Sequence, residues 1–203
     1  MALVYGARIA ISQTMPSEIA QRWDERYSSE ERFSFEQPRP FLCQQAKYLP
    51  THGLALDVAM GLGGNAGFLL THGLRVIGVD ISMIALRKAK TRLPGLMAVL
   101  ADANNFYIPP SYFDVIINFY FLERSLLAEY SLALKPGGVL VVETLTVAMK
   151  DIRPDIDAQN LLQPGELSSS FPDLDILIYQ EGWQEGRESH PRSVASMLAR
   201  RPL

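Results

Sequence analysis

The residues best suited to chemistry lie where an apolar run meets a glycine-rich bend, Leu56-Asp57-Val58-Ala59-Met60-Gly61-Leu62-Gly63-Gly64-Asn65-Ala66. Glycines suit a bend that a ligand covers, because a Cβ there would collide with the ligand. The amides that open the following helix can meet a polar or anionic group. Asp57 adds a carboxylate that can tie down the loop amides and attract an ammonium group. The segment therefore predicts a cofactor loop.

Two further acids follow later apolar runs. Asp80 directly follows the run Arg75–Val79, where it can accept hydrogen bonds from a ribose diol. Asp102 and Ala103 follow Met97–Ala101, where a carboxylate and a backbone amide can read the edge of an adenine. Each acid has a plainer alternative as a helix N-cap or a solvated loop acid. Since successive parallel strands end at one edge of a sheet, a shared ligand is favoured.

The glycine bend also fits the dinucleotide fingerprint G-x-G-x-x-G/A, read here as Gly61 to Ala66. Asp80 would suit either cofactor. A dinucleotide site has no need of an acid at Asp57, and it gives no role to Asp102. A dinucleotide domain also continues with parallel strands, whereas this chain ends in two strands without a helical pattern between them. These features favour a different nucleoside cofactor.

Seven apolar runs are predicted strands, and the first five are near-continuous hydrophobics, as expected when helices cover both faces of a sheet. The polar segment Glu181–Arg192 between the last two runs predicts an antiparallel hairpin. The fold class is therefore α/β: a three-layer sandwich with a seven-stranded, mostly parallel, doubly wound sheet and an antiparallel terminal hairpin (Rossmann-like). The predicted strands are Leu54–Ala59, Arg75–Val79, Met97–Ala101, Phe113–Phe119, Val139–Thr144, Asp175–Gln180 and Ser193–Ala199.

Helical patterns lie between these strands and ahead of them. Ser17–Tyr27 is predicted to place Ile19, Trp23 and Tyr27 on one stripe. This helix and Pro38–Leu49 are expected to lie across the C-terminal edge of the sheet. We expect residues 15–203 to form a single domain, with a helical cap over 15–50 and a core over 54–203. Residues 1–14 are expected to be a disordered or loosely docked lead-in, and Met15 is an alternative start. The core helices are predicted at Asn65–Thr71, Ser82–Arg92, Leu122–Leu134 and Glu166–Phe171.

Composition excludes several classes of protein. The net charge is −3 and no basic cluster exceeds Arg200-Arg201, which argues against nucleic acid as a partner. The single cysteine, Cys43, cannot form an internal disulfide, so a cytoplasmic location is expected. No run approaches the ~18 apolar residues of a membrane span. No metal site is predicted, because no Cys or His stands at ligand spacing from His52, His72 or His190.

From about Leu54 to Ala199 the chain resembles the class I S-adenosylmethionine-dependent methyltransferases, including Lys135-Pro136-Gly137-Gly138 before a strand. Within that family, Trp23-Asp24-Glu25-Arg26-Tyr27, Gly63-Gly64-Asn65-Ala66 and the ending Ala195–Arg200 are similar to the tellurite-resistance-type enzymes, relatives of the thiopurine group. There are departures from the pattern. Ala59 stands where the family has glycine, and the subgroup often has arginine at Gly64 and cysteine at Met60. The subgroup's C-terminal His-Arg element is matched only by Arg187, His190 and Arg192, at shifted spacing.

The resemblance implies S-adenosylmethionine as cofactor and S-adenosylhomocysteine as product, and it implies roles by position. Asn118 has an alternative as the cap of the helix near Leu122, and Trp23 has one as a packing residue. The implied contacts are Asp57, Ala59, Gly61 and Gly63 on the methionine part, Asp80 on the ribose, Ile81 on the adenine face, Asp102 and Ala103 on the adenine amino group, Asn118 and Phe119 (just past the fourth strand) by the sulfonium and methyl, and Tyr27 and Trp23 closing the pocket.

The implied activity is in-line methyl transfer to a small molecule: a soft sulfur, selenium or tellurium nucleophile, an oxyanion or another small metabolite. Anions and soft nucleophiles need no general base, whereas an alcohol or phenol does. The sequence offers no compelling base; the weak catalytic candidates are His190, Arg187, Arg192 and Tyr120. Two alternatives remain open, a non-catalytic cofactor-binding sensor or interaction domain and an NAD-dependent oxidoreductase. The chain is expected to be a monomer or a homodimer.

Overall fold

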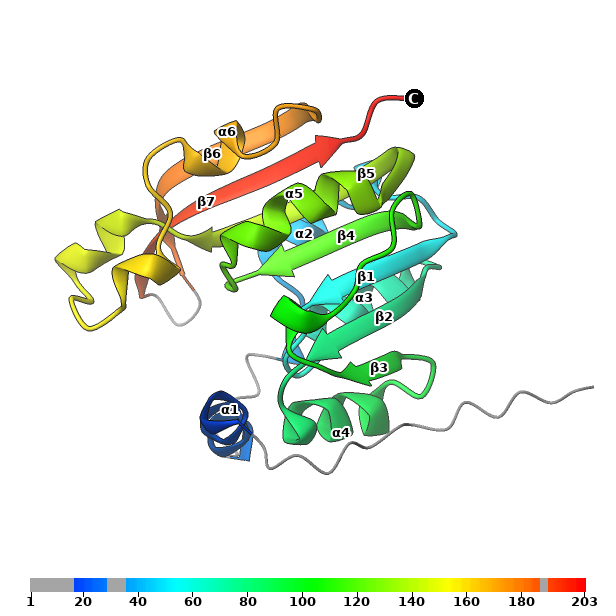
Figure 1. Cartoon of the computed structure of the whole chain (residues 1–203), viewed down its shortest axis with the longest axis horizontal. Helices are drawn as coiled ribbons and strands as arrows, with labels where there is room; N and C mark the ends of the chain where they lie inside the picture. The colour runs from blue at the N-terminus through cyan, green and yellow to red at the C-terminus, as the bar shows by residue number, and fades with distance from the viewer. Residues whose placement is uncertain (1–16, 29–35, 187–189) are drawn as a thin grey trace, which may run out of the picture.

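A single seven-stranded sheet organises the computed structural model, which describes residues 17–28, 36–186 and 190–203 (Figure 1). The strand order is β3-β2-β1-β4-β5-β7-β6. β7 runs antiparallel to both neighbours, and the other pairs are parallel. The predicted fold class is confirmed. The strands are β1 (Leu54–Val58), β2 (Arg75–Asp80), β3 (Met97–Leu100), β4 (Phe113–Phe119), β5 (Leu134–Leu145), β6 (Asp175–Glu185) and β7 (Pro191–Arg200).

Helices form the outer layers, and two hydrophobic clusters join them to the sheet. α2 (Pro40–Gln44), α3 (Gly64–Thr71) and α4 (Met83–Arg92) pack on one face. α5 (Arg124–Ala133) and α6 (Glu166–Ser169) pack on the other. α1 (Glu18–Ser28) lies beside α4, at the carboxyl ends of β1 and β2 (Figure 1). Short 3-10 turns occur at η2 (Ala46–Tyr48), η3 (Ala103–Asn105), η4 (Val147–Asp151) and η5 (Ala158–Asn160).

Local capping explains where the helices start. The Ser82 hydroxyl accepts a hydrogen bond from the Ala85 amide at 3.1 Å, as the predicted capping serine of α4 should. α5 begins at Arg124 and not at Leu122, because the Glu123 carboxylate caps it by accepting from the Ser125 amide at 3.2 Å. The terminal hairpin is longer than predicted, since β6 and β7 pair from Asp175 opposite Arg200 to Glu185 opposite Pro191.

Three expectations about the periphery are wrong. β3 is covered only in part: Val99 and Ala98 pack against the two clusters, but Met97 and Leu100 are exposed, because only the short η3 stands between β3 and β4. α2 does not cross the C-terminal edge of the sheet; its Phe41 and Leu42 are buried in the cluster on the α3 face. Ile19 does not share the buried stripe of α1 but is 56% exposed. The predicted lead-in, residues 1–14, lies outside the described residues.

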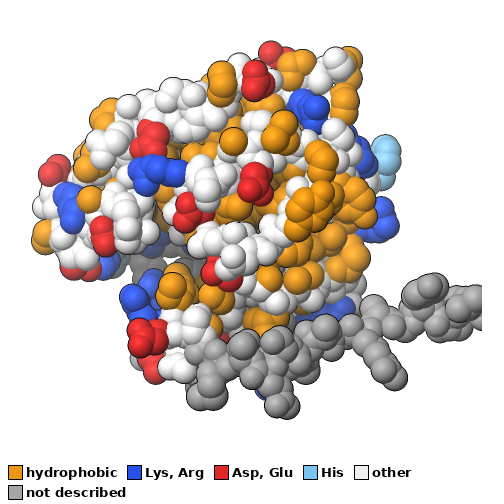
Figure 2. All heavy atoms as spheres, viewed as in Figure 1, with side chains coloured by type: hydrophobic (Ala, Val, Ile, Leu, Met, Phe, Trp, Pro, Cys, Tyr) orange, Lys and Arg blue, Asp and Glu red, His pale blue; other side chains and the backbone are white. Residues whose placement is uncertain are grey.

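Two features of the described residues concern possible contacts with a membrane or with nucleic acid: the length of the helices and the distribution of surface charge. Within the described residues, no helix is long and apolar enough to cross a membrane. On the face seen in Figure 2, basic and acidic side chains are interspersed among hydrophobic ones. The described part of that face therefore offers no continuous basic surface for a phosphate backbone.

Candidate functional site

Asp57 and Asp80 lie together at the carboxyl edge of the sheet. Asp57 is near the end of β1, and Asp80 is the last residue of the neighbouring β2. Both are buried, at 1% and 6% exposure. The two predicted acids are therefore adjacent inside the fold, on strands that end side by side.

Asp80 fastens the glycine bend to β2. Its carboxylate accepts the Gly61 amide at 2.6 Å and the Ser82 amide at 2.8 Å. Burial raises the pKa of Asp80, and these backbone hydrogen bonds lower it in part. Ile81 adds a third backbone hydrogen bond. A carboxylate has about four lone-pair sites, so the Asp80 carboxylate can still accept a further hydrogen bond. Asp80 can thus hold the bend and a diol hydroxyl together.

Asp57 carries a buried oxygen with no partner. The backbone amide of Ala66, in α3, donates to its carboxylate. Its Oδ2 has no hydrogen-bond partner among the described residues. Burial, and then the neighbouring Asp80, raise the pKa of Asp57 well above its usual value. An unpaired buried carboxylate oxygen is costly, and an ammonium group of a ligand would satisfy it.

Positive backbone angles shape the bend. Gly61 and Gly63 have φ of +58° and +74°, a region that glycine enters without strain. The Met60 sulfur lies so close to β2 that a Cβ on Gly78 would be 2.1 Å from it. The bend therefore packs closely against β2, next to Asp80.

Ala59 also adopts a left-handed conformation, with φ of +52°. A non-glycine residue pays roughly 1–2 kcal/mol there. We expect Ala59→Gly to raise the free energy of unfolding by up to about 1 kcal/mol, because part of the gain is lost to the entropy of glycine in the unfolded chain. Chemical denaturation would measure it, with Ala55→Gly in β1 as a control that should destabilise. A less stable Ala59→Gly variant would contradict the strain.

Asp102 and Ala103 are placed less clearly. The Asp102 carboxylate accepts the Asn104 amide at 3.0 Å, so it caps η3, the plainer alternative for this acid. It is half-buried, whereas Ala103 is buried. Ile81 is half-buried directly after Asp80. Asp102 follows β3 at the same sheet edge as Asp57 and Asp80, and an adenine role for it stays a prediction.

Asn118 and Phe119 are the last two residues of β4 and not beyond it. They pack on opposite faces: Asn118 Nδ2 donates to the Tyr130 hydroxyl of α5 at 2.9 Å, while Phe119 joins the cluster on the α3 face. Asn118 does not cap α5, whose cap is Glu123. Its Oδ1 is buried without a partner among the described residues, so Asn118 retains an unused acceptor.

Tyr27 covers the glycine bend from α1. A Cβ on Gly61 would lie 2.8 Å from the Tyr27 hydroxyl oxygen. Trp23 stacks on Tyr27 with ring centroids 5.5 Å apart and is half-buried. Tyr27 therefore touches the predicted cofactor loop, whereas Trp23 packs on Tyr27 and Arg26 of its own helix, as in its alternative.

The contacts that anchor α1 were not predicted. The Asp24 carboxylate accepts the Ser82 hydroxyl at 2.5 Å and the Ile84 amide at 3.0 Å, so it caps α4 from another helix. Lys88 Nζ donates to the Tyr27 carbonyl at 2.7 Å. An acid beside aromatic residues in Trp23–Tyr27 was the available signal. The segment that follows Asp80 and the helix that covers Gly61 are thus tied together.

Of the remaining catalytic candidates, Arg192 and Tyr120 lie together. His190 is exposed just before β7, and Arg187 lies outside the described residues. Arg192 lies by the ring of Tyr120, its guanidinium carbon 5.5 Å from the ring centroid. The described residues contain no group of three or more side chains that could hold a metal ion.

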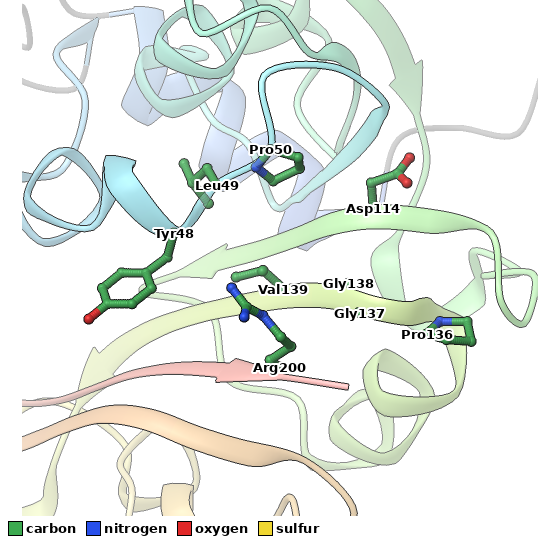
Figure 3. Close-up of a pocket in the computed structure, with 9 residues that line it drawn as sticks. All are labelled: Tyr48, Leu49, Pro50, Asp114, Pro136, Gly137, Gly138, Val139 and Arg200. Carbon is green, nitrogen blue, oxygen red and sulfur yellow. The ribbon is translucent and has the colours of Figure 1, made fainter. Parts of the chain in front are cut away.

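A cavity of about 320 Å³ lies at the opposite edge of the sheet (Figure 3). None of the predicted cofactor-binding residues lines it. The strand-end acids and the bend therefore define the candidate site better than this hollow does. Its lining is Tyr48, Leu49, Pro50, Asp114, Pro136, Gly137, Gly138, Val139 and Arg200.

Comparison with known proteins bears on the site. Residues 55–138 match the family described as "Methyltransferase domain". A phthiotriol/phenolphthiotriol dimycocerosates methyltransferase of Mycobacterium tuberculosis is 38% identical over 92 residues, 41% of this chain and 34% of that protein. The chain thus covers about a third of that relative's length.

Solved structures share the fold. An S-adenosylmethionine-dependent methyltransferase from Methanosarcina mazei superposes with a TM-score of 0.66 at 19% identity, covering 82% of this chain and 99% of that one. TehB from Haemophilus influenzae superposes with a TM-score of 0.67 at 18% identity, covering 90% and 66%. At such identities the likeness concerns the fold alone.

Proposed function

We propose that the core of this chain is a class I S-adenosylmethionine-dependent methyltransferase domain, and that the chain uses it to transfer a methyl group from that cofactor to a small molecule. The observation that carries the proposal is the position of Asp80, which can bind the glycine bend and a ligand hydroxyl at the same time. One carboxylate at the end of β2 fixes the Gly61 amide and keeps lone pairs for hydroxyl groups. The methyltransferase match over residues 55–138 spans both residues.

The residues present fit the cofactor. The unpartnered Asp57 Oδ2 suits the ammonium of its methionine part, and the bend from Ala59 to Gly63 suits its carboxylate and chain. Asp80 suits the ribose hydroxyls and Ile81 the adenine face, while Asp102 and Ala103 remain our proposal for the adenine amino group. When bound, S-adenosylmethionine supplies a methyl group on a cationic sulfonium.

The chain's own contribution is orientation and exclusion of water. Tyr27 closes over Gly61, and Asp24 and Lys88 hold α1 in that position. Fixing two reactants in line can lower a barrier by about 7–11 kcal/mol in favourable cases. The orphan Asn118 Oδ1 and the Phe119 ring, at the end of β4, are the proposed neighbours of the reacting methyl group.

For the acceptor, we propose a small molecule whose nucleophile needs no deprotonation, such as an anion or a soft sulfur, selenium or tellurium atom. The absence of a compelling base in the sequence supports this, and so do the motifs similar to the tellurite-resistance type. A non-catalytic binding domain is the second candidate, favoured by the strained Ala59 in the bend.

Binding and turnover separate these candidates. Calorimetry should show saturable binding of S-adenosylhomocysteine, and NAD⁺ serves as the comparison. A panel of thiols, selenite, tellurite and phenols with S-adenosylmethionine should yield a methylated product. Binding without any product would favour the non-catalytic domain, and binding of NAD⁺ alone would overturn the cofactor assignment.

A further inference from the structure

Two arginines flank a tyrosine at the carboxyl end of β4. Tyr120 directly follows Phe119, the last residue of that strand. The guanidinium carbon of Arg39 lies 4.2 Å from the Tyr120 ring centroid, and that of Arg192 lies 5.5 Å from it. Arg39 comes from the start of α2 and Arg192 from the start of β7. Three separate segments therefore converge on one ring.

The backbone of Tyr120 adopts a strained conformation. Its φ is +59°, a left-handed conformation that is rare for a bulky residue. The Tyr120 amide donates to the Glu143 carbonyl of β5 at 2.8 Å, which fixes the turn. Strained residues of this kind persist where surrounding structure enforces them, and they cluster at functional sites.

Arg39 is also tied to the cofactor bend. Its backbone amide donates to Asn65 Oδ1 at 2.8 Å, and Asn65 stands in the first turn of α3, directly after the glycines. Val58 of β1 pairs with Asn118 of β4, so the bend and Tyr120 follow neighbouring strands. The arginine pair thus lies beside the proposed cofactor site, on the side away from Asp80 and β2.

Among the described residues, two guanidinium groups and one carboxylate act on the Tyr120 phenol. Burial, and then the charge of Glu143, raise the pKa of this phenol, whereas Arg39 and Arg192 lower it. Glu143 is buried and accepts the Ser196 hydroxyl at 2.9 Å. Guanidinium groups bind carboxylate and phosphate oxygens through paired N–H donors.

We propose that Arg39, Tyr120 and Arg192 form the acceptor side of the active site and bind a carboxylate or phosphate group carried by the methyl acceptor. The proposal rests on the proposed function, which makes the adjacent bend the cofactor site. It names the acceptor as a small organic acid or phosphate ester, held by this group while its nucleophile faces the ends of β1 and β4.

Binding of probe acids to the protein saturated with S-adenosylhomocysteine tests this. At constant ionic strength, benzoate or phenyl phosphate should bind saturably by calorimetry, and the neutral benzamide should not. Arg39→Gln and Arg192→Gln should each weaken binding of the better acid at least tenfold. The Lys variants at the same positions should recover part of the loss, because they keep the charge without the fork. Arg200→Gln, on the same strand at the other sheet edge, should leave it unchanged.

The outcomes are distinct. Thermal unfolding and S-adenosylhomocysteine affinity of each variant show whether the fold and the cofactor site are intact, so the proposed function stands or fails on its own measurement. The acceptor proposal is overturned if neither acid binds, if benzamide binds as well as the acids, or if both Gln variants retain the parent affinity.

Discussion

Replacing Asp80 by alanine is expected to weaken binding of S-adenosylhomocysteine by about 1–3 kcal/mol, roughly 5- to 150-fold. The carboxylate that would accept the ribose hydroxyls is lost, and the Gly61 amide loses its partner at the same time. A ligand hydroxyl that leaves water for an unpaired buried position bears that cost. Calorimetry on the purified variant gives the affinity directly.

Stability has to be separated from affinity in this experiment, because the Gly61 and Ser82 amides both lose an acceptor. The titration belongs at a temperature where denaturation curves show the variant folded. Asp114→Ala is the matched control, since Asp114 also accepts a backbone amide, that of Leu54 at 2.8 Å, but at the opposite sheet edge. An unchanged affinity in folded Asp80→Ala would remove Asp80 from the cofactor site.

Asp57→Asn is expected to stabilise the protein at neutral pH and weaken S-adenosylhomocysteine binding. Burial and the charge of Asp80 raise the pKa of Asp57 in the folded state above its ordinary value of 3.8. A raised carboxyl pKa contributes stability below the unfolded value, and that stability is lost as pH rises through the folded pKa. Asparagine does not ionise, so the variant does not lose this stability. Its free energy of unfolding at neutral pH should exceed that of the parent by on the order of 1 kcal/mol, or about 2–4 °C in Tm.

The pH dependence gives the sharper test. The stability difference between the variant and the parent should be small below about pH 4 and should grow as pH rises. Asp114→Asn should show the opposite sign, because hydrogen bonds from Lys135 and from the backbone lower the pKa of Asp114 despite its partial burial. A stability difference for Asp57→Asn that shrinks with rising pH would show that Asp57 is stabilised as an anion.

The opposed effects follow from the same unpartnered oxygen. Without a ligand, the buried charge of Asp57 destabilises the folded protein. With an ammonium group beside Oδ2, the carboxylate can accept a charged hydrogen bond that contributes about 1.5–3 kcal/mol. A residue that costs stability and gains affinity is expected of a binding site. If Asp57 had only a structural role, its replacement by asparagine would lower the stability of the protein and leave ligand binding unchanged.

The core of the fold could be predicted because its strands are buried on both faces. Val115, Ile116 and Ile117 of β4 are fully buried, and such runs read as continuous hydrophobics. The periphery could not be predicted equally well. Met97 and Leu100 belong to an equally apolar run, yet β3 lies at the edge of the sheet, and only the missing helix after it explains their exposure.

The site divides in the same way. Asp57 and Asp80 lie at strand ends and Gly61 in the bend that follows β1, so their positions in the sequence were enough to predict that they lie together. Asp24 and Ser82 are 58 residues apart in sequence, and their contact depends on how α1 docks. Arg39 was missed for the same reason, because a lone arginine before a short helix has no pattern that points to Tyr120.

The antiparallel insertion of β7 between β5 and β6 sets the smallest autonomous unit of this chain. Met197, Leu198 and Ala199 are wholly inaccessible to solvent, so the last strand is as interior as the first. A fragment cut to residues 55–138, the stretch matched by sequence family, would lose most of β5 and all of β7. Hydrophobic residues of β4 would then lie next to an exposed sheet edge, which favours self-association. Trimming from the C-terminus should therefore abolish folding as well as binding.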